Sequence, residues 1–196
     1  RSRSEYLTYL QGFCESQGEN PPVKTDKGSG ILSLCTTAIF MAMNVALSSF
    51  GVPVPGGHLY LNDIVICLAA ILFDPVAAFM VGGVGAFLGD LFFYPTPMFV
   101  SLVTHGLQAV VISVFSHYVL KKHPKFASGI GVTLGAVIMV VGYSLGRAFI
   151  YATPAAAVAK LPFQILQAAV GAVVGMILCW PCGLHKVYTA KILKNR

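Results

Sequence analysis

The chain has 196 residues, of which 56% are hydrophobic and only 10% are charged, and its mean hydropathy is +0.77. Soluble globular domains carry about 25% charged residues, so this composition excludes a soluble enzyme and predicts a protein embedded in a bilayer. We interpret the net charge of +6 as a determinant of membrane topology and not as a nucleic-acid-binding surface.

A polar segment, residues 1–30, comes before the first apolar run and contains the Pro21-Pro22 pair. It lacks the apolar core of a signal peptide, so we expect a cytoplasmic N-terminal segment. The sequence leaves open whether its Arg-Ser-Arg-Ser start is a natural tail.

Six apolar runs follow, separated by clusters of Gly, Pro or Lys. The predicted spans are residues 31–50, 61–73, 76–93, 98–120, 126–151 and 161–182. A spanning helix needs about 20 apolar residues, so six spans leave no room for a sizeable second domain. We therefore predict an all-α membrane protein with a six-helix domain at 31–185 and a basic cytoplasmic tail at 186–196.

Lysine and arginine orient the predicted spans, because cytoplasmic connections retain positive residues more often than translocated ones. One face carries Arg1, Arg3, Lys24, Lys27, Lys121, Lys122, Lys125, Lys186, Lys191, Lys194 and Arg196. The opposite face consists of the predicted loops 51–60, 94–97 and 152–160 and carries only Lys160. Both termini are therefore expected in the cytoplasm of a bacterial cell, with the three loops outside the plasma membrane.

Polar residues of several spans fall at one depth, in the external half of the membrane. They are Asn62, Asp90, His105, Gln108, Tyr143, Arg147, Gln164 and Gln167. Polar groups are costly in hydrocarbon, so those within a span normally face protein or a wet cavity. Their convergence predicts a small substrate-binding pocket that opens outward.

Each of these residues also has a structural interpretation. Arg147 could extend to the lipid headgroups or pair with Asp90, and the glutamines could simply join helices by hydrogen bonds. Asp63, beside Asn62, could cap the second helix. The inner half of the membrane domain has no matching polar groups, which argues against a channel or a proton-coupled carrier and favours a subunit that only captures its ligand.

Small residues form stripes on the predicted helices. Ala38, Ala42 and Ala46 recur at every fourth position of the first span, which lets another helix approach closely. Glycine pairs in the third, fifth and sixth spans offer the same device, and there we expect ordinary packing within the bundle.

Motifs for catalysis or cofactor binding are missing from the sequence. It contains no HExxH, no G-x-S-x-G and no phosphate-binding loop, so we predict neither an enzyme nor an ATPase. Cys179 and Cys182 have redox-like spacing, and His185 follows them, but they lack a fourth ligand or a βαβ context. We therefore expect no bound metal and no cofactor.

Three stretches of the sequence resemble a known family. Residues 56–63 read Gly-Gly-His-Leu-Tyr-Leu-Asn-Asp, residues 69–75 form an Ala-rich run that ends in Asp-Pro, and residues 82–91 form a Gly-rich run closed by Asp90. This pattern is similar to that of the S components of energy-coupling factor (ECF) transporters, which capture vitamins in bacteria. Asp74 departs from the glycine that the family usually has before this proline.

The resemblance implies a six-helix S component with a ligand site near the external side and loop 51–61 as a lid. It implies that the Ala38, Ala42 and Ala46 stripe docks on a transmembrane T subunit and that two partner ATPases use ATP. In this family the S component is thought to topple in the membrane, which would explain a pocket without a path through the protein.

Within the family, the sequence looks most similar to members assigned to pyridoxine or to hydroxymethylpyrimidine, a thiamine precursor. Both are small heteroaromatic compounds with hydroxymethyl groups, which suit a pocket of aromatic, amide and imidazole side chains. Riboflavin, folate and pantothenate stay open as ligands. A non-transport scaffold subunit is the alternative from a different functional class.

Overall fold

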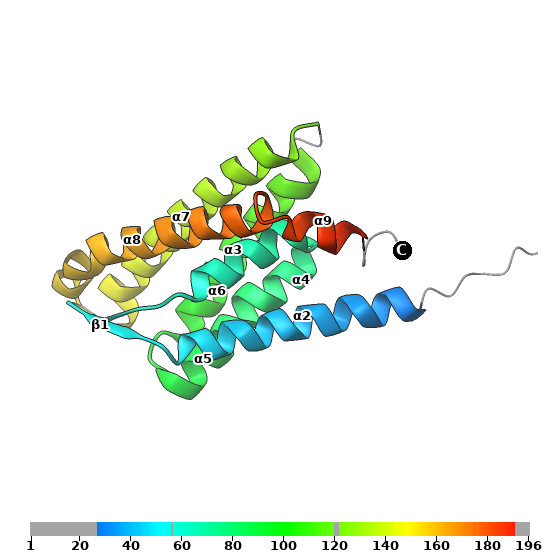
Figure 1. Cartoon of the computed structure of the whole chain (residues 1–196). Helices are drawn as coiled ribbons and strands as arrows, with labels where there is room; N and C mark the ends of the chain where they lie inside the picture. Colours follow the sequence, from blue (N-terminus) through cyan, green and yellow to red (C-terminus); the bar gives the residue numbers. More distant parts are fainter. Residues whose placement is uncertain (1–26, 56, 120–121, 191–196) are drawn as a thin grey trace, which may run out of the picture.

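The computed structural model describes residues 27–55, 57–119 and 122–190 and consists mainly of helices (Figure 1). Its elements are α2 (Lys27–Ser48), β1 (Val52–Val54), β2 (Gly57–Leu59), α3 (Asn62–Leu72), α4 (Pro75–Phe79), η1 (Met80–Val84), α5 (Gly85–Phe93), α6 (Met98–Val114), η2 (Phe115–Val119), α7 (Pro124–Gly146), η3 (Arg147–Tyr151), α8 (Pro154–Cys179) and α9 (Leu184–Tyr188). The predicted segment 1–30 lies outside the described residues except for 27–30, as do residues 191–196 of the predicted tail.

Helices long and apolar enough to cross a membrane confirm the prediction of a membrane protein. Five such stretches are found among the described residues, at 30–48, 75–93, 98–119, 124–151 and 154–179. The predicted run 61–73 instead forms α3, which has 11 residues. At a rise of 1.5 Å per residue it is about 16 Å long, about half the thickness of a hydrocarbon core. The second of the six predicted spans is therefore a short helix.

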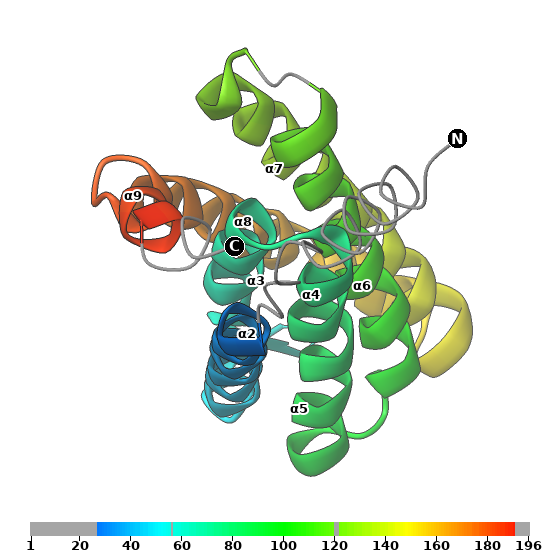
Figure 2. The same cartoon turned by 90° about the vertical axis from the view of Figure 1, so that its right-hand side faces the viewer.

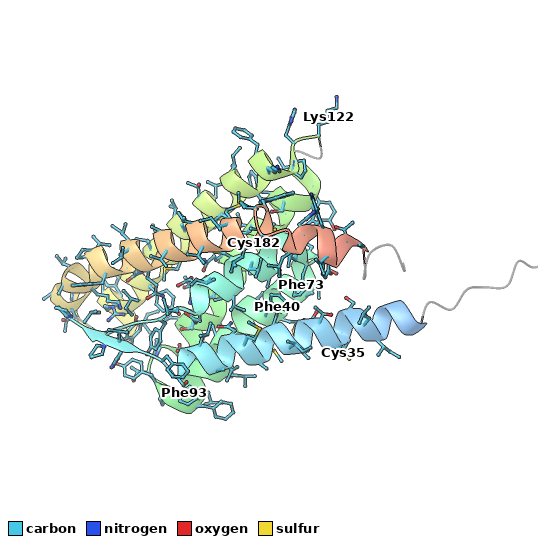
Figure 3. All side chains as sticks on the ribbon, in the orientation of Figure 1. Cys35, Phe40, Phe73, Phe93, Lys122 and Cys182 are labelled. Carbon is cyan, nitrogen blue, oxygen red and sulfur yellow. The ribbon has the colours of Figure 1, made fainter. Side chains whose placement is uncertain are left out.

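Helix α3 lies inside the bundle, and nearly all of its residues are buried. It packs on α2, α6 and α8, which surround it on several sides (Figure 2). At its end, the ring of Phe73 contacts that of Phe40 from α2 at a centroid distance of 5.0 Å (Figure 3). A helix enclosed in this way needs no contact with lipid and can be short.

Glycines bring several helices into close contact, as expected from their spacing. Gly171 and Gly175 of α8 face Asp63 and Cys67 of α3, and a Cβ atom at Gly171 would lie 2.5 Å from Asp63 Cβ. The pair at 142 and 146 packs on α6 in the same way, and the pair at 85 and 89 packs on α2. These glycine pairs therefore hold the bundle together.

Helix α2 lies at the edge of the bundle (Figure 2). Only 6% of its apolar window is buried. Asn44 and Ser48 face inward and are buried, whereas Ala38, Ala42 and Ala46 are all exposed. The small-residue stripe therefore lies on the exposed side of α2 in the described part of the chain.

The predicted loop 51–60 contains a short antiparallel hairpin, in which Val52 pairs with Leu59 and Val54 with Gly57. It lies at the end of the bundle where α8 begins, which we call the hairpin end (Figure 1). Gly57 has a φ of 150°, and a Cβ atom there would lie 2.9 Å from Arg147 Nη1. The positive φ favours glycine at this position, whereas the Arg147 guanidinium lies at the end of a flexible side chain and can shift.

The predicted start of the last span at residue 161 was wrong, because helix α8 begins at Pro154, seven residues earlier. Thr153 caps the helix, because its side chain accepts a hydrogen bond from the Ala156 N–H at 3.3 Å. Proline at the first helical position removes no helical hydrogen bond and therefore favours a helix start here. As a result, Lys160 lies on the helix and not in the predicted loop.

Three π-helical segments, η1, η2 and η3, interrupt the predicted α-helical periodicity. In η3 the Ala152 N–H donates to the Arg147 carbonyl at 3.1 Å, five residues back. Such a turn holds more residues than an α turn and changes the direction of the side chains that follow it. Arg147 and Tyr151 both belong to η3.

Candidate functional site

A pocket lies at the hairpin end, between the hairpin and the ends of the long helices. Its lining residues are Gly57, His58, Tyr60, Asn62, Asp90, Tyr94, Pro97, His105, Met139, Tyr143, Arg147, Tyr151, Lys160, Gln164 and Gln167. These include every residue predicted for the substrate site except Gln108. The spans thus bring the predicted residues together, and Gln108 lies one contact behind the wall.

The space inside this pocket is small. The volume open to the centres of water molecules is about 40 Å³. A water needs about 10–15 Å³ by this measure, so the pocket holds roughly three waters. The hairpin or side chains must therefore move before a vitamin-sized molecule can enter.

Asp63 lies at the base of the site and is only 1% exposed. Its Oδ2 accepts a hydrogen bond from Gln167 Nε2 at 2.5 Å, and its Oδ1 accepts one from Gln108 Nε2 at 3.2 Å. A buried carboxylate needs such donors, because an unpaired charge away from water is strongly unfavourable. The carboxylate of α3 thus joins the amides of α6 and α8.

His105 is connected to the same group. Its Nδ1 lies 2.7 Å from Gln108 Oε1 and 3.7 Å from Asp63 Oδ1. Only the shorter distance is a hydrogen bond. The imidazole ring also packs edge to face on Tyr143, with ring centroids 5.1 Å apart. His105 therefore stands between the buried amides and an aromatic wall of the pocket.

A second hydrogen-bonded chain borders the pocket on another side. The Tyr143 hydroxyl donates to Ser101 Oγ at 2.5 Å, and the Ser101 hydroxyl donates to the carboxylate of Asp90. Asp90 belongs to α5, Ser101 to α6 and Tyr143 to α7. The predicted residues Asp90 and Tyr143 are thus linked through Ser101, a serine that no sequence pattern indicated.

The remaining predicted amides also have defined partners. Gln164 Nε2 donates to the Val140 carbonyl at 2.9 Å, and Asn62 Nδ2 donates to Ser48 Oγ at 3.4 Å. Asn62 Oδ1 is buried and has no hydrogen-bond partner among the described residues. Asn62 therefore offers an acceptor at the pocket wall.

The hairpin is attached to α8 at two points. Lys160 Nζ donates to the His58 carbonyl, and the Tyr60 N–H donates to Gln167 Oε1 at 3.1 Å. Burial, together with the charge of Asp90, raises the pKa of the Tyr60 hydroxyl from 10.0 to about 12, so this hydroxyl keeps its proton at neutral pH. These contacts fix the hairpin over the pocket.

Two residues differ from their sequence interpretation. Asp63 does not cap α3, since the residue before the helix is Leu61 and no side-chain cap is formed. Its partners lie 45 and 104 residues away, which local pattern reading could not find. Lys160 was expected to lie in a loop, but it is 2% exposed and lies on the first turns of α8.

Comparisons with known proteins found a matching transporter family and two relatives. The family model of the S component of the ECF-type riboflavin transporter matches residues 30–183. The chain is 30% identical over 161 residues to the thiamine precursor transporter HmpT of Lactococcus lactis subsp. cremoris (strain MG1363), which covers 80% of this chain and 90% of HmpT. It is 34% identical over 137 residues to an uncharacterized protein of Pyrococcus woesei, covering 68% of this chain and 89% of that protein.

Proposed function

Because this chain belongs to the family of S components of ECF-type transporters, we propose that it captures a neutral, single-ring heteroaromatic compound in the pocket at the hairpin end. The first candidate is hydroxymethylpyrimidine, and the second is pyridoxine. As a member of this family the chain is an integral membrane protein and a transporter component, not an enzyme.

The charges around the pocket carry the proposal of a neutral ligand. Among the described residues, the carboxylates of Asp63 and Asp90 and the cationic groups of Arg147 and Lys160 lie at or directly behind its wall. Their formal charges cancel. In a site of low dielectric, an added anion would have no countercharge left over, whereas a neutral ligand keeps the balance. This favours hydroxymethylpyrimidine or pyridoxine over the acids folate and pantothenate.

The size of the pocket supports a ligand with one ring. Even a single-ring compound needs more room than the present volume of about 40 Å³, and riboflavin, with three fused rings and a sugar-alcohol chain, needs much more. The name of HmpT, a transporter of a thiamine precursor, adds support for hydroxymethylpyrimidine. Riboflavin, named by the family model, is the main alternative ligand.

We further propose that the chain crosses the membrane six times, with the short helix α3 as one crossing and both termini in the cytoplasm. The hairpin end would then face outward. The exposed stripe of Ala38, Ala42 and Ala46 would dock on the T subunit, and partner ATPases would use ATP, while this chain itself binds no cofactor.

The experiment is thermal unfolding of the detergent-purified protein with hydroxymethylpyrimidine, pyridoxine, riboflavin, folate and pantothenate. A ligand that binds only the folded state raises the apparent stability by mass action. We expect a shift with hydroxymethylpyrimidine and a smaller shift or none with the two acids. A shift with riboflavin alone would overturn the single-ring proposal.

A variant of Gln167 on α8, with a control at its neighbour, locates the site. Gln167→Ala removes contacts to Asp63 and to the hairpin, and it should abolish the ligand-induced shift. Leu166→Ala, one position along the helix on its exposed side, should preserve the shift. If no compound shifts the unfolding of folded protein, the scaffold alternative replaces capture.

A further inference from the structure

Asp63 is the acceptor in both of its hydrogen bonds to glutamine side chains, and this affects which groups of a ligand can bind nearby. An ionised carboxylate only accepts hydrogen bonds. Gln108 and Gln167 must therefore both turn their Nε2 groups toward Asp63, at 3.2 and 2.5 Å, and turn their Oε1 atoms away from it. The orientations of two amides on separate helices are thus set by one buried group.

The far end of each amide agrees with this orientation. Gln167 Oε1 accepts from the Tyr60 N–H, a backbone group that can only donate. Gln108 Oε1 lies 2.7 Å from His105 Nδ1, and an amide oxygen only accepts, so Nδ1 carries a proton. Hydrogen bonds therefore connect the Tyr60 N–H to Asp63 through Gln167. They connect His105 to Asp63 through Gln108.

The neutral imidazole has one donor and one acceptor nitrogen. Since Nδ1 carries the proton, Nε2 is the acceptor. No described residue forms a hydrogen bond with Nε2, and His105 lines the pocket. The ring therefore presents an acceptor to whatever the pocket holds.

We propose that Asp63 is a positioning residue that makes the part of the pocket wall around His105 accept hydrogen bonds, so that the ligand is recognised there through donor groups. This inference rests on the proposed function and specifies its chemistry. An exocyclic amine or a hydroxyl group meets the requirement at His105 Nε2, and a group that can only accept does not.

Two other residues of the pocket wall have the same polarity. Gln164 uses its Nε2 on the Val140 carbonyl, which leaves Oε1 as its free acceptor. Tyr143 donates its hydroxyl proton to Ser101, which in turn donates to Asp90, so the phenolic oxygen is left with an acceptor lone pair. Asp63 and Asp90 thus set the direction of hydrogen bonds on the pocket wall through the side chains that donate hydrogen bonds to them.

The test uses Asp63→Asn, which keeps the size of the side chain but adds a donor. One amide must then turn round. If Gln108 turns, the proton of His105 moves from Nδ1 to Nε2; if Gln167 turns, the Tyr60 N–H loses its acceptor. The matched control is Asp74→Asn, since Asp74 caps α4 through the N–H groups of Val76 and Ala77 and asparagine caps a helix equally well.

The readout is the nitrogen NMR spectrum of labelled histidine, with the His105 signals assigned by their loss in His105→Ala, together with hydrogen exchange at Tyr60. In the wild type and in Asp74→Asn, Nδ1 should be protonated. In Asp63→Asn, either the protonated nitrogen changes or exchange at Tyr60 accelerates. The proposal is overturned if neither changes. Should Asp63→Asn fail to fold, Gln108→Met removes the acceptor of Nδ1 and must lower its protonated fraction.

Binding supplies the second arm, with hydroxymethylpyrimidine and two analogues as probes. One analogue has the hydroxymethyl group O-methylated and the other has the amino group dimethylated. In the wild type at least one methylation should weaken binding about 10- to 100-fold, and Asp63→Asn should lose this discrimination. If both analogues bind the wild type like the parent compound, donor recognition is refuted. If hydroxymethylpyrimidine does not bind while the His105 proton still responds to Asp63, only the choice of ligand fails.

Discussion

Gly171 is the position where the structure gives the sharpest estimate of a mutational effect. A Cβ atom there would lie 2.5 Å from Asp63 Cβ and 3.1 Å from the Asp63 carbonyl carbon, whereas ordinary contacts are 3.4–4 Å. In Gly171→Ala, helices α3 and α8 must therefore separate by about 1 Å. Inserting a group into a packed interior costs about 1–3 kcal/mol.

The same displacement also reaches the ligand site. Gln167 and Gly171 lie one turn apart on α8, and the 2.5 Å hydrogen bond from Gln167 Nε2 to Asp63 would lengthen toward the limit of a hydrogen bond. Alanine offsets part of the loss, because it is favoured over glycine in a helix by about 1 kcal/mol. We expect a net destabilisation of about 1 kcal/mol and weaker ligand binding.

The assay is thermal unfolding in detergent, with and without hydroxymethylpyrimidine. For a soluble chain of this length, 1 kcal/mol corresponds to about 2–4 °C, so Gly171→Ala should unfold lower than the wild type by about that amount. The matched control is Gly129→Ala in α7, where the nearest atom to a Cβ is Met176 Cε at 4.0 Å, and this variant should be neutral or slightly stabilised. Equal midpoints for the two variants would refute the packing argument.

Three further predictions concern the lid, the exposed stripe and pH. Lys160→Met removes the hydrogen bond to the His58 carbonyl, so hairpin amides should exchange faster with solvent. The ligand should dissociate about ten-fold faster if the lost hydrogen bond contributed about 1.4 kcal/mol. Unchanged exchange and dissociation rates would show that Lys160 does not hold the lid. Ala42→Leu puts a large side chain on the exposed stripe and should abolish uptake by cells while leaving ligand binding by the purified protein intact. Because the pKa of Tyr60 is about 12 in the folded protein and 10.0 as its ordinary value, its contribution to stability should be intact below pH 10 and decline between pH 10 and about 12. Tyr60→Phe should remove that part of the decline, as measured by unfolding across this pH range.

The sequence was sufficient to predict seven of the residues that line the pocket, because helices in a membrane run roughly parallel and depth can be counted along each one. His105, Tyr143 and Gln164 were assigned in this way, and all line the pocket. The prediction needed no knowledge of which helices are neighbours.

The roles of single residues were harder to predict, because they depend on contacts between distant parts of the chain. Asp63 has the position of a capping residue in a local pattern, whereas its actual partners are on α6 and α8. Lys160 follows Thr153-Pro154, which reads as a stop signal but is here the start of α8. A proline can end one helix or begin the next, and the residues that decide between these outcomes are not adjacent to it.

The π turn of η3 suggests how ligand preference could change within this architecture. A π turn holds one residue more than an α turn, so it is equivalent to an insertion of a single residue into α7. Deleting one residue within 147–151 would restore the α-helical register and rotate the preceding or following side chains by about 100°. Since Arg147 and Tyr151 both line the pocket, a change in chain length by one residue would replace two groups of its wall at once. The number of residues in η3 thus determines which side chains line the pocket, just as the identity of those residues does.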